Sequence, residues 1–343
     1  MKAVVFNLGC KVNQYESDKI AEELTKIGYE VSEQLVPADI YVLNTCAVTA
    51  EAERKSRQAV ARCRALNNDA KVFICGCASQ KASSLFKKDN VYYVAGATNK
   101  QSIINHLKDE GFSSDVKDLP TKYDDAGILS SANRTRVYVK IQDGCNSFCS
   151  YCIIPYLRGR SRSRAIDDIV DEVSVLATKT SEIVLIGINI MSYGLDIGTN
   201  LTELIKALKD FDVRIRLGSF YAEGITEELL DALFSLKKFC PHFHLSLQSG
   251  DRQVLKDMNR HYTPEIYEEK INLIRRYDKN ACIATDVIVG FPTESEECHK
   301  NTVEFIKKVG FSDIHVFPFS SREGTRAAKL KQLPPEVIKR RRN

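Results

Sequence analysis

The stretch Asp143-Gly144-Cys145-Asn146-Ser147-Phe148-Cys149-Ser150-Tyr151-Cys152 spaces three cysteines as CxxxCxxC, directly after an apolar run, Val137 to Ile141, that predicts a strand. In a chain with 11 Cys among 343 residues, chance supplies only about 0.01 such triplets. A tetrahedral zinc site needs four ligands, and no fourth Cys or His follows closely. Three thiolates on a four-iron cluster leave one iron open for a substrate or cofactor. The spacing therefore favours an open iron–sulfur site over three half-buried free cysteines.

The composition is that of an ordinary globular protein, with 27 % charged and 43 % hydrophobic residues. A chain of 343 residues is long enough for two domains and a sizeable core. No apolar run approaches the length of a membrane span. Cysteines without a signal peptide indicate the reducing cytoplasm, and metal or redox chemistry rather than disulfides. The net charge of +4 is only mildly basic and does not by itself indicate a nucleic-acid partner.

The N-terminal part, residues 1–110, alternates short apolar runs with amphipathic segments. The predicted strands are 2–8, 39–44, 71–75 and 91–95, and the predicted helices are 13–27, 49–66 and 99–108. Such alternation indicates an α/β domain with a doubly wound parallel sheet. Residues 111–133 are polar and rich in turn residues, so we expect an interdomain linker there.

Three cysteines follow predicted strands of this first domain: Cys10, Cys46 and Cys77. Ligands of open α/β sheets collect at the carboxyl ends of the strands, so the three thiols can converge on one point. Buried structural cysteines are an equally good explanation from spacing alone. Cys75 is interpreted as a core residue that faces the same side as Cys77.

Residues 134–333 repeat the alternation of strands and helices. The predicted strands are 136–142, 182–186, 213–217, 242–247, 281–289 and 313–317, and the predicted helices are 166–177, 201–208, 226–236, 264–277 and 295–309. Six strands fall short of the eight of a closed (β/α) barrel, so we expect a partial (β/α)6 barrel that is open on one side. Barrel chemistry sits at the carboxyl ends of the strands, where the CxxxCxxC loop lies.

Basic residues gather after the cysteine loop and at the end of the chain. Arg158, Arg160, Arg162 and Arg164 alternate, and in extended backbone their guanidiniums would share one face suited to phosphates. The alternative is a solvated loop with intramolecular ion pairs. Residues 334–343 form a basic tail that we expect to fray.

Polar residues and glycines follow the other strands of the second domain. They are Gly187, Asn189, Ser219, Gln248, Arg260 and Asp286. Any one of them can be a core hydrogen-bonder or a turn residue, but together they would ring one mouth of the barrel. His242 and His244 alternate within a predicted strand and have no further metal ligands nearby in the sequence, so structural roles are favoured.

Several motifs resemble one known family. They are DGCNSFCSYCIIPYLRGRSRSR, LGCKVNQYES, LNTCAVT, CGCASQ, LQSG, MNRHYT, TDVIVGFP and FPFSSREGT. These stretches are similar to the radical S-adenosylmethionine (SAM) methylthiotransferases, which add a methylthio group to tRNA adenosine or to a ribosomal protein. The resemblance runs from Met1 to about Leu333. GCKVNQYES resembles the branch that acts on N(6)-threonylcarbamoyladenosine beside the anticodon.

The resemblance implies two [4Fe-4S] clusters. Cys145, Cys149 and Cys152 would hold the radical SAM cluster, whose open iron binds the amino and carboxylate groups of SAM. The other set, Cys10, Cys46 and Cys77, would hold an auxiliary cluster that carries the transferred sulfur. The protein's part is then to position the cofactors and the base while the cofactors perform the difficult chemistry.

The resemblance also implies SAM contacts and partners. Gly187 would let the backbone approach the methionyl group, Asn189 and Gln248 would hydrogen-bond its polar groups, and Arg260 would take a carboxylate. We expect a monomer that acts on a tRNA anticodon loop and uses an electron donor and a sulfur source. Family members commonly continue into a small β-barrel RNA-binding module, which we expect to be absent here.

Two kinds of alternative remain open. Within the family, the substrate can instead be N(6)-isopentenyladenosine in tRNA or a ribosomal protein. Outside it, a two-cluster electron carrier would have fully ligated clusters and would not cleave SAM. Two sites of three cysteines and a large barrel argue against a carrier, since electron transfer needs little scaffold.

Overall fold

A computed structural model describes residues 1–88, 90–116, 118–123 and 134–343. The chain divides into two compact units. The first comprises residues up to 133 together with 153–160, and the second comprises 134–152 and 161–343. No helix within the described ranges combines the length and the apolar character that crossing a membrane requires.

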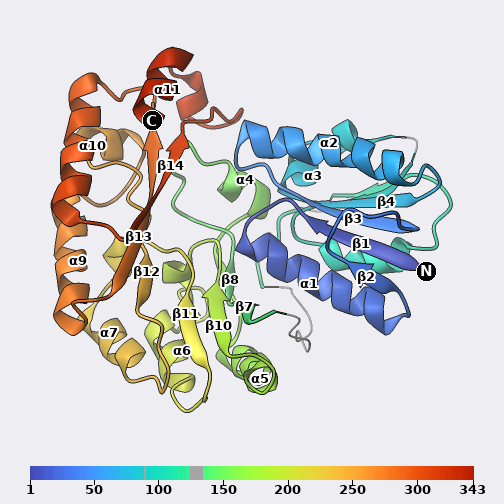
Figure 1. The fold of residues 1–343 in the computed structure, drawn as a ribbon, viewed down its shortest axis with the longest axis horizontal. Helices are drawn as coiled ribbons and strands as arrows, with labels where there is room; N and C mark the ends of the chain where they lie inside the picture. The colour runs from blue at the N-terminus through green and yellow to red at the C-terminus, as the bar shows by residue number, and fades with distance from the viewer. Residues whose placement is uncertain (89, 117, 124–133) are drawn as a thin grey trace. The chain divides into compact units, whose positions relative to one another are not determined.

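The first unit is built on a six-stranded sheet in the order β2-β1-β3-β4-β5-β6, in which every pairing is parallel (Figure 1). The strands are β1 (Lys2–Asn7), β2 (Glu30–Ser32), β3 (Ile40–Thr45), β4 (Lys71–Gly76), β5 (Val91–Ala95) and β6 (Ser113–Asp115). The predicted doubly wound α/β sheet is thus confirmed. β6 lies inside the segment 111–133 that we expected to be a linker, of which residues 117 and 124–133 fall outside the described part.

Helices cover both faces of this sheet. The elements are α1 (Lys11–Lys26), α2 (Ala50–Leu66), α3 (Cys77–Lys81), η1 (Ser83–Phe86), η2 (Lys100–His106) and α4 (Ile154–Arg158). α1 and η2 pack on one face, and α2, α3, η1 and α4 on the other. The two faces follow from strand alternation: Phe73 and Cys75 of β4 face α1, and Ile74 faces α2.

Cys75 is fully buried, as expected of a core residue, but it does not face the same side as Cys77. The strand ends at Gly76 and Cys77 is the first residue of α3, so the alternation of β4 no longer applies to it. Cys77 therefore packs with the core on the α2 side of the sheet.

The second unit contains six parallel strands in chain order. They are β7 (Arg136–Lys140), β10 (Glu182–Ile186), β11 (Arg214–Leu217), β12 (His242–His244), β13 (Cys282–Val289) and β14 (Asp313–Pro318). They form two three-stranded sheets, β7-β10-β11 and β12-β13-β14. Parallel bridges between Ile215 and Phe239 and between Phe220 and Leu245 connect the sheets. The six strands confirm the predicted partial (β/α)6 arrangement.

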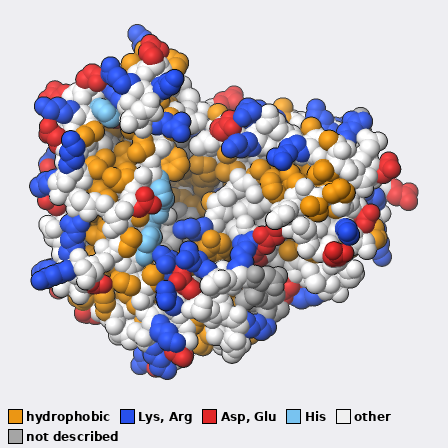
Figure 2. Space-filling model, in the orientation of Figure 1, with side chains coloured by type: hydrophobic (Ala, Val, Ile, Leu, Met, Phe, Trp, Pro, Cys, Tyr) orange, Lys and Arg blue, Asp and Glu red, His pale blue; other side chains and the backbone are white. Residues whose placement is uncertain are grey.

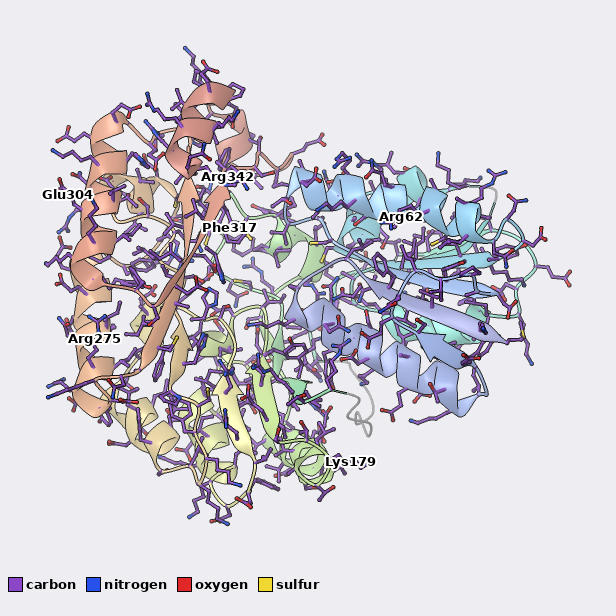
Figure 3. All side chains as sticks on the ribbon, viewed as in Figure 1. Arg62, Lys179, Arg275, Glu304, Phe317 and Arg342 are labelled. Carbon is purple, nitrogen blue, oxygen red and sulfur yellow. The ribbon has the colours of Figure 1, made fainter. Side chains whose placement is uncertain are left out.

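Helices follow the strands of the second unit. They are α5 (Ile166–Ala177), α6 (Leu201–Ala207), α7 (Glu227–Phe234), α8 (Arg252–Asp257), α9 (Pro264–Tyr277), α10 (Glu296–Val309) and α11 (Pro335–Arg342), with 3₁₀ turns η3 (Ile190–Ser192), η4 (Ala222–Gly224) and η5 (Ala327–Lys329). α9 and α10 lie outside β13 and point Arg275 and Glu304 away from it (Figure 3). Thr263 and Ser295 cap these two helices by accepting from the backbone N–H of Ile266 and Cys298.

The end of the chain is ordered, which corrects the expectation of a fraying basic tail. Arg341 of α11 is 8 % exposed. It donates to the Glu294 backbone oxygen at 2.8 Å and side-chain Oε2 at 2.6 Å, and to Glu296 Oε1 at 2.8 Å. Hydrogen bonds from both Nη atoms of this guanidinium anchor the helix.

Candidate functional site

The CxxxCxxC loop leaves the sheet after β7 through a short strand, β8 (Gln142–Asp143), which pairs antiparallel with β9 (Arg162–Ser163). Cys145 and Cys149 are buried, and Cys152 is half-buried. The Ser147 backbone N–H lies 3.4 Å from Cys145 Sγ and donates to it. Such a donor stabilises a thiolate.

The side chain of Gln142 fixes the start of this loop, a role that sequence reasoning missed. Its Nε2 donates to the backbone oxygens of Asp143 at 2.8 Å and Gly144 at 2.7 Å, and its Oε1 accepts from the Asn189 N–H at 2.8 Å. Gln142 is completely buried. A buried amide at the end of an apolar strand was the available signal, because buried polar groups are placed where the backbone needs partners.

The far side of the loop is held by a distant turn. Asn259 Nδ2 donates to the backbone oxygens of Ser147 at 3.1 Å and Phe148 at 3.2 Å. Phe148 and Asn259 both have positive φ, at 45° and 58°. Non-glycine residues rarely adopt this conformation, and it persists only where surrounding contacts impose it. The cysteine loop is therefore held in a strained backbone conformation by the contacts around it.

Asp143 supplies the negative charge beneath the loop. Its Oδ2 lies 3.0 Å from Lys140 Nζ and 3.0 Å from Arg162 Nη2, and its Oδ1 accepts from the Gly144 N–H at 2.7 Å. All three charged side chains are at most 5 % exposed. Loss of any one member of such a buried cluster would leave the others as unpaired buried charges, which would destabilise the loop.

The four alternating arginines do not form one open face, which corrects that expectation. Arg162 is buried against Asp143, Arg164 pairs with Glu172, and Arg158 is buried in the first unit. Arg160 is the exposed member. Arg158 ends helix α4 and Gly159 follows with φ 78°, so the start of the run is not extended. Within strand β9, the ion pair with Asp143 takes up Arg162. Basic side chains are spread over the face shown in Figure 2.

Arg260 lies beside the cysteine loop. Its Nη1 is 3.6 Å from Cys149 Sγ, and its guanidinium carbon lies 3.8 Å from the centre of the Tyr221 ring. Desolvation raises the pKa of Tyr221 well above its ordinary value, and the thiolates of Cys149 and Cys145 raise it further, against the influence of Arg260. Cys145, Cys149, Tyr221 and Arg260 thus form one electrostatic group.

Two expected contact residues follow β10. A side chain on Gly187 would place its Cβ 2.8 Å from Gln142 Oε1, so glycine is required here by Gln142. Asn189 is 5 % exposed, and its Nδ2 donates to Ser192 Oγ at 2.8 Å. Its Oδ1 is buried and has no hydrogen-bond partner among the described residues. A buried acceptor without a partner is suited to a ligand's donor.

Gln248 and Ser219 follow later strands of the barrel. Gln248 has φ 67° and is held by two backbone hydrogen bonds, its N–H to Asp286 O at 2.8 Å and its O from Ile288 N–H at 2.9 Å. Ser219 is half-buried. Near it, Glu223 Oε2 is a second buried acceptor that lacks a partner in the described part of the chain.

Asp286 lies in the middle of β13 and not at its carboxyl end. Its Oδ1 is 3.0 Å from His244 Nε2 and 3.2 Å from His315 Nδ1. Burial opposes ionisation of Asp286, but the two imidazoles outweigh burial and lower its pKa. Asp286, which we expected among the cofactor contacts, therefore has two histidines as its neighbours.

The first unit gathers its own three cysteines. Cys10 precedes α1, Cys46 precedes α2, and Cys77 opens α3, at the carboxyl ends of the adjacent strands β1, β3 and β4. All three thiols are free. Burial raises the pKa of Cys46 to about 11, the Val48 N–H opposes this, and the neighbouring thiolates of Cys77 and Cys10 add to the rise. The three cysteines therefore follow neighbouring strands at one edge of the sheet.

Gly76 makes the approach of Cys77 possible. It has φ 111°, and a Cβ there would lie 2.3 Å from the backbone oxygen of Thr45. Only glycine fits this position between β4 and α3. The backbone therefore turns tightly against β3, which brings Cys77 to the strand end that Cys46 follows.

A buried group of charges lies under these cysteines. Arg158 grips both oxygens of Glu16 at 3.0 Å, and Lys100 pairs with the same carboxylate. Arg158 Nη2 donates to Asn13 Oδ1 at 2.9 Å, and Nε donates to Cys77 Sγ at 3.4 Å. The guanidinium therefore connects the buried carboxylate of Glu16 to the sulfur of Cys77. The sequence contained no local pattern that links these residues.

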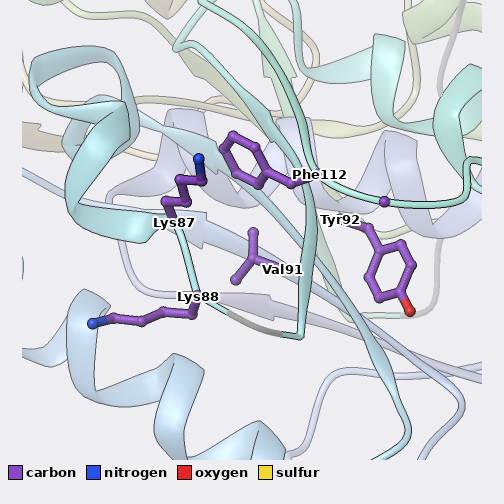
Figure 4. A pocket seen from close by; sticks show the side chains of 6 residues that line it. Lys87, Lys88, Val91, Tyr92 and Phe112 are labelled. Atoms are coloured by element: carbon purple, nitrogen blue, oxygen red, sulfur yellow. The ribbon is translucent and has the colours of Figure 1, made fainter.

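The amino ends of the strands carry a different feature. A pocket of about 480 Å³ is lined by Lys87, Lys88, Val91, Tyr92, Gly111 and Phe112 (Figure 4). These residues precede or begin β5 and β6, so the pocket lies at the edge of the sheet opposite to the cysteines. It contributes nothing to the cysteine site.

Comparisons with known families cover most of the chain. Residues 139–306 match the radical SAM superfamily, and residues 2–96 match a family described as uncharacterized protein family UPF0004. A solved structure of the cobalamin-dependent S-adenosylmethionine radical enzyme OxsB is similar over 100 % of this chain and 55 % of its own, with TM-score 0.57 and 10 % identity. That likeness concerns the fold.

Curated relatives match over nearly the whole chain. The threonylcarbamoyladenosine tRNA methylthiotransferase MtaB of Aquifex aeolicus is 40 % identical over 100 % of this chain and 86 % of its own length. The protein of the same name from Bacillus subtilis is 35 % identical, over 100 % and 79 %. A tRNA-2-methylthio-N(6)-dimethylallyladenosine synthase of Acetivibrio thermocellus is 34 % identical, over 97 % and 73 %.

Proposed function

Because the chain belongs to the radical SAM methylthiotransferase family, we propose that it methylthiolates carbon 2 of N(6)-threonylcarbamoyladenosine, next to the anticodon of tRNA. The broader activity, that of a radical SAM tRNA methylthiotransferase, follows from the family. The choice of nucleoside is supported by the names of the relatives that share 35 to 40 % identity with the whole chain. The observation that carries the mechanism is structural: two separate groups of three cysteine thiols that follow strands of the two units.

The CxxxCxxC loop fits a [4Fe-4S] cluster. Two of its three cysteines are buried, and Cys145 already receives a backbone N–H. Cys145, Cys149 and Cys152 would be the ligands, and Arg260 beside Cys149 would compensate the charge of the thiolates. When bound, the clusters and SAM supply one-electron cleavage of SAM and the sulfur that is transferred.

The first unit fits a second, auxiliary cluster. Cys10, Cys46 and Cys77 come from adjacent strands, and the buried cations Arg158 and Lys100 lie beneath them. Arg158 donates directly to Cys77, so it orients this thiolate and stabilises its charge. A site that gathers thiolates over buried cations is suited to an anionic iron–sulfur group.

The mouth of the barrel fits SAM. SAM carries an amino group and ribose hydroxyls, which donate hydrogen bonds, and the buried acceptors Asn189 Oδ1 and Glu223 Oε2 lack partners within the described ranges. The SAM carboxylate requires a cation, and Arg260 supplies one beside Cys149. Gln248, held in a strained backbone conformation, contributes an amide, and Ser219 completes the proposed set.

The partners follow from the chemistry. The substrate base must be unstacked to expose carbon 2, which a single-stranded anticodon loop makes easy. Arg160 is the exposed arginine after the cysteine loop and is proposed to contact tRNA phosphate. The enzyme is proposed to act as a monomer in the cytoplasm, with an electron donor and a sulfur source.

An anaerobic assay tests the proposal. The protein with both clusters reconstituted is incubated with SAM, a reductant, and tRNA that carries either threonylcarbamoyladenosine or isopentenyladenosine. We expect mass spectrometry of the digested nucleosides to show a methylthio group only on the threonylcarbamoyl nucleoside. Modification of the isopentenyl nucleoside alone would instead favour the activity named for the Acetivibrio relative. Formation of 5′-deoxyadenosine with neither nucleoside changed would contradict the proposed substrate.

A further inference from the structure

Strands β12, β13 and β14 bring two histidines and an aspartate together inside the second unit. One ligand-type atom from each of His244, Asp286 and His315 lies within 4.8 Å of the others. Asp286 and His315 are register partners on adjacent parallel strands. The sequence favoured a structural role for His244 because its two neighbours come from later strands, which sequence spacing does not reveal.

The buried nitrogen of His244 is the first sign of a ligand. His244 is 8 % exposed, and its Nε2 is shielded from solvent. Among the described residues this atom makes no hydrogen bond, although Asp286 Oδ1 is only 3.0 Å away. The two atoms therefore lie beside each other rather than in line. The buried His244 nitrogen thus keeps its lone pair or proton without a hydrogen-bond partner in the described part of the chain, as a metal ligand can.

The distances fit a metal ion. Metal–nitrogen and metal–oxygen bonds of about 2.1 Å place neighbouring ligand atoms about 3.0 Å apart in octahedral geometry and about 3.4 Å apart in tetrahedral geometry. Asp286 Oδ1 lies 3.0 Å from His244 Nε2 and shares a hydrogen bond of 3.2 Å with His315 Nδ1, which a bound ion would replace. Two histidines and one carboxylate are a ligand set that zinc and ferrous iron both accept, with coordination positions left open.

The outer contacts of His315 fit the same role. Its second nitrogen, Nε2, lies 3.1 Å from Asp313 Oδ2. Histidines that bind metals commonly donate their other N–H to a carboxylate, which fixes the tautomer and the ring orientation. The His315 side chain is 46 % exposed, so an ion can reach the site. Histidine side chains are visible beside an acidic one over β12–β14 in Figure 2.

We propose that His244, Asp286 and His315 bind one divalent transition-metal ion, at a site separate from the cysteines. The ligands are two imidazole nitrogens and one carboxylate oxygen. The remaining coordination positions take water or an oxygen ligand from a bound molecule. The site requires no electron transfer, and it neither depends on nor alters the assignment of the cysteines.

The test uses the full chain with both iron–sulfur clusters loaded, so that the cysteines are occupied. After equilibration with Zn²⁺ and removal of free ion, zinc and iron are counted by mass spectrometry. We expect wild type to hold about one zinc more per chain than His315→Ala, with the iron unchanged. Co²⁺ in place of Zn²⁺ should give ligand-field bands without a thiolate-to-cobalt charge-transfer band.

Matched variants separate binding from folding. His315 is half exposed, so its replacement leaves the fold intact, which an unchanged thermal transition and iron content would verify. Asp286→Asn should also lose the zinc. His261→Ala, which removes an exposed histidine of the same unit, should keep it. Equal zinc in wild type and His315→Ala, or a thiolate band with Co²⁺, would overturn the proposal whatever the outcome of the nucleoside assay.

Discussion

The two groups of cysteines are assembled in opposite ways. In the first unit, Cys10, Cys46 and Cys77 come from three adjacent strands, so the whole sheet holds them in place. In the second unit, all three cysteines lie on one loop that is pinned by side chains such as Gln142 and Asn259. The first site is a property of the fold, and the second is a property of a loop.

Buried charge supports both sites, so the difference between them is backbone strain. Arg158, Lys100 and Glu16 lie under the first group, and Asp143 with Lys140 and Arg162 lies under the second. Strained backbone accompanies the second: the three non-glycine residues with positive φ in the described part, Phe148, Gln248 and Asn259, all belong to that unit. A network of charges fails as a whole when one member is lost, whereas a strained turn can relax locally.

The largest expected effects come from replacing one cysteine in each group, because the two groups are proposed to act in different steps of the reaction. Cys149→Ala should reduce 5′-deoxyadenosine formation by about three orders of magnitude or more, because the open iron that binds SAM is lost. Cys46→Ala should keep 5′-deoxyadenosine formation and lose the methylthio product to the same extent. Both products are measured in one anaerobic reaction with tRNA.

Cys63→Ala is the matched control for this pair. Cys63 is fully buried in the same core as Cys77 but lies inside α2, away from the strand ends. We expect it to keep both products and all of its iron. Loss of 5′-deoxyadenosine in Cys46→Ala would mean that the two groups do not have separate roles.

The same difference explains what sequence reasoning found. The CxxxCxxC loop can be recognised from the sequence because its cysteines are neighbours in the chain. Such a spacing would rarely arise by chance. Cys10, Cys46 and Cys77 were ambiguous from spacing, and only the family resemblance favoured a cluster. Strands and helices were predicted well because burial imposes a period on the sequence, with the longest segments the clearest.

Residues that act through distant contacts were missed or misread. Nothing near Arg158 indicates that its partner is Glu16, because the pair joins positions 142 residues apart. A local pattern of alternating arginines suggested an open phosphate site, and tertiary ion pairs overrode it. Gln142 and His315 likewise gained their neighbours only when separate segments met. The hydrophobic periodicity of a sequence predicts which side chains are buried, but it does not predict which buried polar groups will pair.

Arg158→Met tests the dependence of the first site on buried charge. The substitution leaves the Glu16 carboxylate buried with one cation fewer, which should lower the free energy of unfolding of this unit by about 3–5 kcal/mol. It should also weaken retention of iron at Cys77, since the donor to that sulfur is removed. Urea unfolding and iron content measure the two effects.

Two further variants serve as controls for Arg158. Arg62→Met, on the exposed side of α2 (Figure 3), should change the free energy of unfolding by less than about 0.5 kcal/mol. Arg158→Met combined with Glu16→Met removes both partners and should recover much of the lost stability. If the double variant were no more stable than the single one, buried charge would not be what supports this site.

Asp143→Asn tests the corresponding charge in the second unit. The amide can still accept from Gly144, but it no longer neutralises Lys140 and Arg162. We therefore expect the free energy of unfolding to fall by about 2–4 kcal/mol. The effect should be confined to the loop and appear as slower 5′-deoxyadenosine formation. Asp171→Asn, on the exposed side of α5, should leave that rate unchanged. An equal loss of iron from the first unit would contradict a local role.

Gln248→Gly gives the smallest effect and tests whether strain serves the second site. Its φ of 67° suits glycine, so the substitution should stabilise the protein by about 1 kcal/mol. The lost amide should raise the KM for SAM about tenfold, equivalent to about 1.4 kcal/mol of binding. Gln248→Ala loses the amide but keeps the strain, so it should show the same rise in KM without the gain in Tm. If both variants kept the wild-type KM, the strained backbone at Gln248 would have to be explained by its hydrogen bonds to β13 and not by the cofactor.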